Sequence, residues 1–511
     1  MDSNKRKKSP ARRLIEKVEA LRKEVNGAID PATRTKYAQF MTPSPISVFM
    51  ASLFQTKKEV IHLLDPGAGI GSLSTCFVSR MLKRKTPPVE IRITAYEIDA
   101  FLCSCLHRMF DMCRQACEEI GVDFVSEIRQ ENFIESCSHQ GSGRYTDKPM
   151  EEYDCVILNP PYGKINSNSI TRRQLRKVGI ETTNLYTAFL ALSARHLSPG
   201  GELVSITPRS FCNGPYFLPF RKYFLGEMAF KRIHEFEARD KAFKDDSVLQ
   251  ENIIIHAIKT AEYPKKVTVS ISHKPKEKIF RRYLPYARVV NPTDGNLIIS
   301  LIHNAEGENA KQLISRLPAT LEDLGITVST GRVVDFRAPD YLRDNPEKET
   351  VPLIYPTHFH RGRISWPAEH SRKPNAIISN NMSRELLVPN GIYVLVKRFT
   401  AKEEKKRVVA ALYEGQDGHD FVGFENHLNY YHLRGAGLTS DIATGLCIFL
   451  NSTTVDTFFR LFSGHTQVNA TDLRNFRYPS IKQLKFLGRN AIKILNNQQM
   501  IDRKVSRVLE E

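Results

Sequence analysis

One stretch decides the fold: Tyr153-Asp154-Cys155-Val156-Ile157-Leu158-Asn159-Pro160-Pro161-Tyr162-Gly163. Its apolar first half predicts a buried β-strand. The strand must end at Asn159, because Pro160 and Pro161 supply no N–H group to a neighbouring strand. In open α/β sheets, ligands bind at the carboxyl ends of the strands. We therefore expect a rigid, ligand-binding loop at this edge of a sheet.

The loop has groups that suit a planar substrate with an exocyclic amine. The Asn159 side-chain oxygen and the Pro160 carbonyl can accept the two N–H protons of such an amine, and the Tyr162 ring can stack on its face. Pro161 stiffens the backbone between them. Taken alone, the tetrapeptide also fits an ordinary proline-rich turn after a strand. The rest of the chain argues against that alternative.

Two further loops predict a nucleoside cofactor. A strand at residues 60–64 runs into Asp65-Pro66-Gly67-Ala68-Gly69-Ile70-Gly71, and its glycines let the backbone approach a ligand closely. A second strand, residues 91–96, ends at Glu97, an acid placed to bind ribose hydroxyls. Asp65 would repel a pyrophosphate, and no third phosphate-binding glycine is clear. This favours a nucleoside such as S-adenosylmethionine over a dinucleotide.

The order of strands and helices predicts the fold class. Strands alternate with helices up to about residue 185, with a third strand at 123–128, and further strands follow at 202–207, 232–236 and 250–258. We expect a doubly wound, Rossmann-like α/β sheet with an antiparallel edge. Before it, Leu14, Val18, Leu21 and Val25 recur at helical spacing in a basic segment. That helix could contact a DNA backbone or pack on the core.

Composition indicates the class of protein and its partner. The 511 residues suffice for two or three domains, and no apolar run reaches the roughly 18 residues of a membrane span. The basic N-terminus lacks the apolar segment of a signal peptide. The nine cysteines show no zinc spacing, so we expect reduced thiols, no metal site and a cytoplasmic location. The net charge of +18 favours a nucleic-acid partner over a generally basic surface.

The C-terminal part carries the expected DNA-binding surface. From about residue 266 the segments become short and mixed, and basic and aromatic residues interleave. A single charge run there could also be a solvated face. The expected organisation is a basic helix at 1–33, a catalytic domain at 34–265, a mixed α+β recognition domain at 266–480 and a C-terminal helix at 481–511. The candidate DNA-contacting residues are Arg332, Arg337, His358, Lys397, Arg398 and Gln467.

The motifs and their order resemble a known family. Residues 39–43 (Gln-Phe-Met-Thr-Pro), 65–71, 97–99 and 159–162, followed by a C-terminal recognition region, resemble the gamma-type DNA methyltransferases that modify adenine N6. The match covers residues 34–260. Segments 248–253, 329–336, 387–391 and 466–470 are similar to the PstI/BsuBI-like members, which extends the resemblance over most of the chain.

The resemblance implies roles for matched positions. Catalysis falls to Asn159, Pro160, Pro161 and Tyr162, and the target base also meets Phe243. Thr42 would contact the methionine end of the cofactor, Glu97 its ribose and Ile98 its adenine. Asn132-Phe133 stands where the family usually has Asp-Phe; Asn132 is neutral but can still accept a hydrogen bond from the cofactor N6. The full cofactor-binding set is Gln39, Phe40, Thr42, Pro43, Asp65, Pro66, Gly67, Ala68, Gly69, Glu97, Ile98, Asn132, Phe133 and Asn159.

The resemblance also implies an activity. The protein would transfer a methyl group from S-adenosylmethionine to the N6 amine of a flipped-out adenine in double-stranded DNA, at a palindrome such as CTGCAG. It would act in the bacterial cytoplasm at the nucleoid and protect DNA against a cognate endonuclease encoded as a separate protein. Two alternatives stay open: a methyltransferase acting on RNA or on protein glutamine, because Asn-Pro-Pro-Tyr occurs there too, and a non-catalytic DNA specificity subunit.

Overall fold

The protein divides into two compact units. The computed structural model describes residues 9–28, 41–139, 150–236, 251–275, 277–369, 372–401, 403–464 and 466–510. Contacts between residues group the chain into unit 1, which ends at His303, and unit 2, which begins at Asn304. Each unit has a sheet framework of its own, so the two are described separately.

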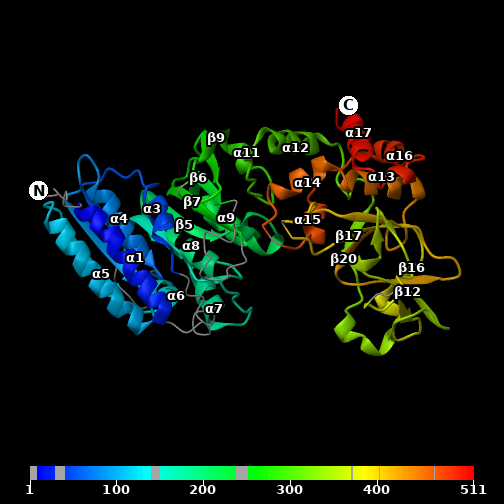
Figure 1. The fold of residues 1–511 in the computed structure, drawn as a ribbon, viewed down its shortest axis with the longest axis horizontal. Coiled ribbons are helices and arrows are strands. Elements are labelled where there is room, and N and C mark those ends of the chain that lie inside the picture. The colour runs from blue at the N-terminus through cyan, green and yellow to red at the C-terminus, as the bar shows by residue number, and fades with distance from the viewer. Residues whose placement is uncertain are drawn as a thin grey trace, which may run out of the picture. The chain divides into compact units, whose positions relative to one another are not determined.

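Unit 1 is built on one nine-stranded sheet with the order β3-β2-β1-β4-β5-β7-β6-β8-β9 (Figure 1). The first five of these strands run parallel, whereas β7 is antiparallel to both β5 and β6. This confirms the doubly wound α/β fold with an antiparallel edge. The strands are β1 (Val60–Pro66), β2 (Glu90–Tyr96), β3 (Asp123–Arg129), β4 (Tyr153–Leu158), β5 (Leu197–Pro208), β6 (Met228–Phe236), β7 (Asn252–Lys259), β8 (Lys266–Ser272) and β9 (Phe280–Pro285).

Helices cover the two faces of this sheet. Crossovers between parallel strands are right-handed, so the helices between β1 and β3 lie on one face of the sheet and those between β4 and β5 lie on the other. Four further helices, which precede β1 or follow β3 or β5, pack against one of these two groups. The first group is α1 (Pro10–Ala28), α3 (Ser44–Ala51), α4 (Ser72–Leu82) and α5 (Ala100–Glu118), and the second is α6 (Phe133–His139), α7 (Ile170–Lys177), α8 (Leu185–Arg195) and α9 (Leu218–Glu227). A short helix, α11 (Tyr286–Val289), follows β9.

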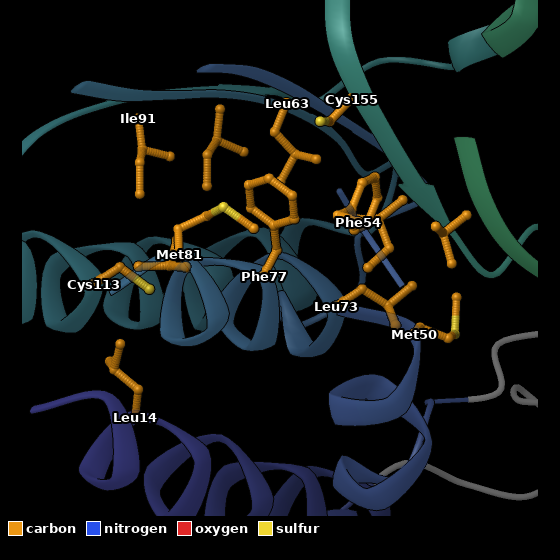
Figure 2. Packing of buried hydrophobic residues seen from close by; sticks show 14 of the residues in the cluster. Leu14, Met50, Phe54, Leu63, Leu73, Phe77, Met81, Ile91, Cys113 and Cys155 are labelled. Carbon is orange, nitrogen blue, oxygen red and sulfur yellow. The ribbon is translucent and has the colours of Figure 1, made fainter. Parts of the chain in front are cut away.

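The main core of unit 1 lies between the sheet and the first helix group. Phe77 and Met81 of α4 point at Leu63 and Ile91 of the sheet, and all four side chains are at most 2% exposed (Figure 2). Burial of such side chains contributes roughly 1.5–3 kcal/mol each. Figure 2 also shows Leu14 rising from α1 towards the other side of these helices. The core therefore holds β1 and β2 rigidly, and with them the loops at their carboxyl ends.

Unit 2 contains two smaller sheets and a set of helices. The sheets have the orders β10-β20-β17-β18-β14-β13 and β11-β15-β12-β19-β16. Their strands are β10 (Thr327–Thr330), β11 (Leu342–Arg343), β12 (Thr350–Ile354), β13 (Phe359–His360), β14 (Arg363–Ile364), β15 (Ala376–Ile378), β16 (Leu387–Pro389), β17 (Tyr393–Lys397), β18 (Ala410–Tyr413), β19 (Phe421–Phe424) and β20 (Leu428–His432). The helices are α12 (Ala305–Arg316), α13 (Ser440–Leu450), α14 (Thr453–Arg460), α15 (Ala470–Arg474), α16 (Ile481–Gly488) and α17 (Gln498–Leu509).

Several boundaries differ from the sequence prediction. The division expected after residue 265 falls between β7 and β8 of one sheet, because β8 pairs with β6 and β9 pairs with β8. The contacts place the division after His303 instead. The single C-terminal helix predicted from 481 is two helices, α16 and α17, because α16 ends at Gly488, whose backbone is in close contact with Asp441 of α13.

Among the described residues, no single helix has both the length and the apolar character needed to cross a membrane. Helices α13 and α14 of the described chain pass that test only when they are taken together, and the chain bends by 55° between them.

Candidate active site

A cavity of about 300 Å³ opens at the carboxyl ends of β1, β2 and β4. It brings together groups from motifs that lie up to 119 residues apart in the sequence, between Thr42 and Pro161. The predicted site residues that line it are Thr42, Gly67, Ala68, Gly69, Glu97, Ile98, Asn132, Phe133, Asn159 and Pro161. The structure therefore brings ten of the predicted site residues together around one cavity.

The glycine loop after β1 forms one wall of the cavity. The backbone N–H groups of Gly67 and Ala68 both donate to the Tyr96 carbonyl at 2.9 Å, which holds the loop against the end of β2. Gly71 ends the loop at φ +81°, and a Cβ there would lie 2.6 Å from Leu106 Cδ1. Only glycine fits at this position without strain. The loop is thus rigid and open towards the cavity.

Glu97 lies at the end of β2 and faces the same cavity. Its Oε2 accepts a hydrogen bond from the Gly69 N–H at 2.8 Å, and its Oε1 accepts from Ile98 and Asp99. Burial raises the pKa of Glu97, although these backbone N–H groups partly oppose the shift. Each carboxylate oxygen has two lone pairs, so Glu97 can still accept a ribose hydroxyl. Ile98 beside it is 54% exposed at the cavity, an apolar surface suited to a planar ring.

Asp65 lies beneath the glycine loop rather than in the cavity wall. It is fully buried, and Ser74 Oγ donates to its Oδ2 at 2.5 Å. Its Oδ1 has no hydrogen-bond partner among the residues that the structure describes. Burial raises the pKa of Asp65 to about 7, because the charged form is poorly solvated there. Asp65 therefore supports the glycine loop from below through Ser74, and it does not line the cavity itself.

Asn159 follows β4, as the proline pair requires. Its Nδ2 donates to Thr42 Oγ1 at 3.0 Å, and Tyr162 Oη donates to its Oδ1 at 3.4 Å. These contacts orient the amide with its nitrogen towards Thr42 and its oxygen towards Tyr162. Oδ1 is thus the end of the amide that can act as an acceptor for an N–H group of a substrate.

Tyr162 is supported by a second aromatic side chain. Its ring lies edge-on to Tyr186 of α8, with 6.3 Å between centroids, and the Tyr186 hydroxyl bonds Ser210 Oγ at 2.7 Å. Burial raises the pKa of Tyr162, so its phenol stays protonated at neutral pH. Tyr162 is therefore a neutral, oriented ring next to an amide acceptor.

Asn132 differs from its expected role. Its Oδ1 accepts hydrogen bonds from Ile134 N–H at 3.0 Å and from Glu135 N–H at 3.4 Å, which caps α6. The side chain therefore turns its acceptor towards the helix, whereas we expected it to accept from the cofactor N6. Phe133 next to it is buried against Phe189, with 5.1 Å between ring centroids.

Several predicted residues do not line the cavity. Asp65, Pro66, Pro43, Pro160 and Tyr162 lie next to lining residues in sequence but do not themselves form the wall. Gln39, Phe40 and Phe243 lie outside the described residues. Leu185, Phe189 and Thr171 do line it and were not predicted as site residues. Leu185 and Phe189 share the apolar face of α8, a pattern that is indistinguishable from ordinary core packing.

The predicted DNA-contacting residues fall into two groups in unit 2. His358 is 1% exposed: its Nδ1 accepts from the Tyr355 N–H and its Nε2 bonds Asn375 Oδ1, each at 2.9 Å. It is a core residue, so the expected surface role is wrong. The Arg332 guanidinium donates to the backbone carbonyls of Glu385 and Leu387. Sequence could not reveal either partner, because both lie far along the chain.

The second group gathers around Phe399, which is 43% exposed. The Arg398 guanidinium lies 5.6 Å from the Phe399 ring, the His427 ring lies 4.8 Å from it, and the backbone of Gln467 forms a bridge with that of Phe399. We name Arg398, Phe399, His427 and Gln467 the Phe399 cluster. Elsewhere in unit 2, Arg337 lies over the exposed Phe336 ring, and Lys397 lies over Phe359.

Within the part of the chain that the structure describes, no three His, Cys, Asp or Glu side chains are placed to hold a metal ion. All nine cysteines are buried thiols.

Comparison with known proteins gives close relatives. The Eco57I restriction-modification methylase family matches residues 89–243. The type II methyltransferase M.PstI of Providencia stuartii is 43% identical over 472 residues, which is 92% of each chain. The type II methyltransferase M.BsuBI of Bacillus subtilis is 42% identical over 506 residues, 97% of this chain and 98% of its own.

Solved structures share the fold. The type IIL restriction-modification enzyme MmeI, in complex with DNA, has a TM-score of 0.54 at 11% identity and covers 100% of this chain and 77% of its own. The DrdV–DNA complex has a TM-score of 0.51 at 13% identity and covers 95% of this chain and 60% of its own.

Proposed function

We propose, from the premise that this chain belongs to the family of type II restriction-modification methyltransferases that includes M.PstI and M.BsuBI, that its target is the N6 amine of adenine in double-stranded DNA. Family membership makes the protein a DNA methyltransferase that uses S-adenosylmethionine. The choice of base, the recognised sequence and the roles of single residues are the proposal.

One observation carries the proposal: the Asn159 amide is held with its oxygen towards Tyr162 and its nitrogen on Thr42. An exocyclic amine on a ring is a poor nucleophile, because its lone pair is delocalised. Asn159 Oδ1 and the Pro160 carbonyl accept its two N–H groups, which draws the nitrogen towards a tetrahedral geometry and localises the lone pair. Pro161 and Pro160 keep the loop rigid, so little reorganisation is needed when the substrate arrives.

The role proposed for Tyr162 is to stack on a target base that has left the DNA duplex. An adenine inside a duplex cannot reach a cavity at a strand end, so it must leave the stack at a cost of a few kcal/mol. Stacking on Tyr162 offsets about 1–3 kcal/mol of that cost. Tyr186 keeps the ring in place, and Phe243 is the candidate for the opposite face of the base.

The cavity fits the cofactor of the family. Glu97 accepts ribose hydroxyls, Ile98 packs on the adenine, and the glycine loop leaves room for the backbone to lie close. The buried Asp65 carboxyl holds the loop from below through its hydrogen bond from Ser74. When bound, S-adenosylmethionine supplies an electrophilic methyl group on a sulfonium. The residues of this chain bind it, exclude water and orient the amine.

Unit 2 is proposed to choose the DNA sequence. The Phe399 cluster combines a cation, one exposed ring, one partly exposed ring and an amide, the groups that contact phosphates and base edges. Relatives suggest a palindrome such as CTGCAG. A cognate endonuclease, as a separate protein, and a cytoplasmic location at the nucleoid complete the proposal. The rivals are methylation of RNA or protein glutamine and a non-catalytic specificity role.

The test is the identity of the modified base. DNA, RNA and protein from cells that express the parent chain are hydrolysed and compared by mass spectrometry with cells that express Asn159→Ala. We expect N6-methyladenine in DNA from the parent alone, and sequencing of modified bases then gives the site. If the parent-dependent methyl group is found on cytosine in DNA, or only in RNA or protein, the proposed substrate is wrong. If the parent adds no methyl group to DNA, RNA or protein, the result favours a non-catalytic DNA specificity subunit.

A further inference from the structure

We propose that the N-terminal helix α1 is a brace for the catalytic amide: Glu19 fixes the start of α3 and thereby holds Thr42 against Asn159. The brace rests on the proposed role of Asn159. It links the motif residue Thr42 to three residues outside the quoted motifs, namely Ser44, Glu19 and Arg22. The Eco57I family match begins at residue 89, well beyond this helix.

Helix α1 packs on the catalytic unit with its apolar face. Leu14, Val18, Leu21 and Val25 are each at most 7% exposed, and they join two core clusters with residues of α3, α4 and α5. Ser79 Oγ on α4 donates to the Ala11 carbonyl at 2.7 Å. The core-packing alternative for this helix is therefore correct. A helix held along its whole length can transmit a fixed position to its neighbours.

Glu19 projects from α1 to the first residue of α3. Its Oε2 accepts from Ser44 N–H at 3.1 Å and from Ser44 Oγ at 2.6 Å, and its Oε1 accepts from Arg22 Nη2 at 2.9 Å. Burial opposes the charge on Glu19, but the hydrogen bonds from Arg22 and Ser44 outweigh it and lower its pKa to about 2. The carboxylate is thus ionised throughout the physiological range. Arg22 is itself 4% exposed, so the pair is largely shielded from solvent.

This contact replaces a cap that the local sequence lacks. The residue before α3 is Pro43, which has no side-chain oxygen to accept from the first N–H groups of the helix. Glu19, 25 residues earlier, supplies that acceptor together with a negative charge at the helix N-terminus. The start of α3 is therefore fixed by α1.

The start of α3 in turn fixes Thr42. Ile46 and Ser47 N–H both donate to the Pro43 carbonyl, and Ser47 Oγ lies 3.3 Å from the carbonyls of Thr42 and Pro43. Thr42 is 3% exposed and its Oγ1 accepts from Asn159 Nδ2. If that contact is lost, the amide can rotate and present Nδ2 to the substrate amine. Two donors would then face each other, and the amine would lose an acceptor.

The first experiment separates positioning of Asn159 from cofactor binding. Thr42→Val removes the hydroxyl at equal size, and Thr42→Ser keeps it. We expect kcat at saturating cofactor to fall about tenfold in Thr42→Val, the cost of one misplaced hydrogen bond, and to recover most of the way in Thr42→Ser. Calorimetry measures cofactor affinity separately, because Thr42 also lines the predicted cofactor cavity, and kcat is therefore compared at a cofactor concentration that saturates each variant. A higher Kd whose effect disappears at saturating cofactor would mean that Thr42 acts only on the cofactor, and the brace would be wrong.

The second experiment tests the helix itself in the full chain. Glu19→Ala and Ser44→Ala are compared with Glu24→Ala, which changes an exposed acid on the same helix. Assays run well below each variant's Tm. We expect kcat to fall about three- to tenfold in the first two and to stay unchanged in the control. Because the brace acts through Thr42, Glu19→Ala should cost nothing more in the Thr42→Val background. A lower Tm with unchanged kcat would leave α1 a purely stabilising helix.

The outcomes also separate the brace from the function it rests on. If Asn159→Ala keeps full activity, the proposed role of Asn159 fails. If Asn159→Ala is inactive while Thr42→Val and Glu19→Ala both keep the parent kcat, only the brace fails.

Discussion

Unit 1 and unit 2 present their functional groups in different ways. In unit 1, the parallel strands β1, β2 and β4, of six or seven residues each, end at one edge of the sheet, so the loops that follow them converge on one cavity. In unit 2, strands of two to five residues form two sheets, and the basic residues named above lie on their strands as well as in the loops between them. Chemistry needs groups preorganised away from water, whereas reading DNA needs groups that reach outward.

The largest expected effect on activity is that of a substitution at Asn159. Asn159→Ala removes one of two acceptors for the amine, and Asn159→Asp places a negative charge beside Tyr162 and Thr42. We expect methyl transfer to fall at least about 10³-fold in both, the size found when preorganised catalytic groups are removed. Cofactor binding by calorimetry should survive. A tritium-transfer assay that finds full activity in Asn159→Ala would show that the cavity does not organise the chemistry in this way.

Exchange of the whole of unit 2 tests whether this unit chooses the DNA sequence. Residues 304–511 are replaced by the matching segment of a relative with a different site, with the join placed where the units divide. We expect the hybrid to methylate the donor's site, with preference over the parent's site of about 10³ or more. Sequencing of modified bases measures this. An active hybrid that still selects the parent's site would place sequence choice in unit 1.

Tyr162 lies between these two functions, because it meets the base only after DNA has bound. Tyr162→Ala should weaken base flipping by about tenfold, equivalent to the loss of roughly 1–3 kcal/mol of stacking, with little change in overall DNA affinity. Fluorescence of 2-aminopurine at the target position reports flipping, and anisotropy reports binding. Tyr186→Phe, which keeps the supporting ring, is the matched control. Equal fluorescence in parent and variant would remove the stacking role.

The same contrast explains how much the sequence could predict. The strand before Asn159, the loop at Gly67 and the acid Glu97 are each fixed by local rules, so the sheet and most of the cavity follow from sequence. Asn132 lines the cavity as expected, but its bonds to the backbone of α6 could not be predicted, because an Asn before a helix and an Asn at a cofactor look the same in sequence. Glu19 could not be found at all, since its importance comes from Ser44, which lies 25 residues away across the fold.

In unit 2, local rules identify basic and aromatic residues but not which of them reach the surface. His358 and Arg398 both belong to basic-aromatic clusters in the sequence, yet only the second borders an exposed ring. Arg398→Ala should weaken DNA binding about tenfold. It should also reduce the slope of log K against log salt concentration by about 1, the value for one lost phosphate contact. His358→Ala should instead cost about 1–3 kcal/mol of stability, because Asn375 and the Tyr355 N–H lose their partner.

Anisotropy at several salt concentrations and thermal unfolding distinguish these two variants. Lower DNA affinity in a folded His358→Ala protein would restore the surface role that its burial argues against. An unchanged salt slope in Arg398→Ala would remove the Phe399 cluster from the DNA interface.

The smallest expected effect concerns stability alone and returns to the core of unit 1. His234 on β6 is fully buried beside Phe49 and Phe236, and its Nδ1 bonds Ser270 Oγ at 3.0 Å. Burial, followed by the nearby Arg232 charge, lowers the pKa of His234 to about 3. The folded protein therefore keeps this imidazole neutral under conditions where the unfolded chain protonates it, at an unfolded pKa of about 6.5.

The sign of the pH effect follows from this difference. Above pH 6.5 neither state binds the proton, so His234 adds no pH dependence. As pH falls from 6.5 towards 3, only the unfolded state gains a proton, and stability is lost by up to about 1.4 kcal/mol per pH unit. His234→Gln keeps a polar side chain near Ser270 but cannot titrate, so its stability should fall less steeply between pH 6.5 and 5. Urea unfolding at each pH measures the slopes, with His107→Gln, an exposed histidine on α5, as the control. Parallel slopes for His234→Gln and the parent would mean that water reaches this imidazole, and that the core beneath the catalytic edge is less closed than its packing indicates.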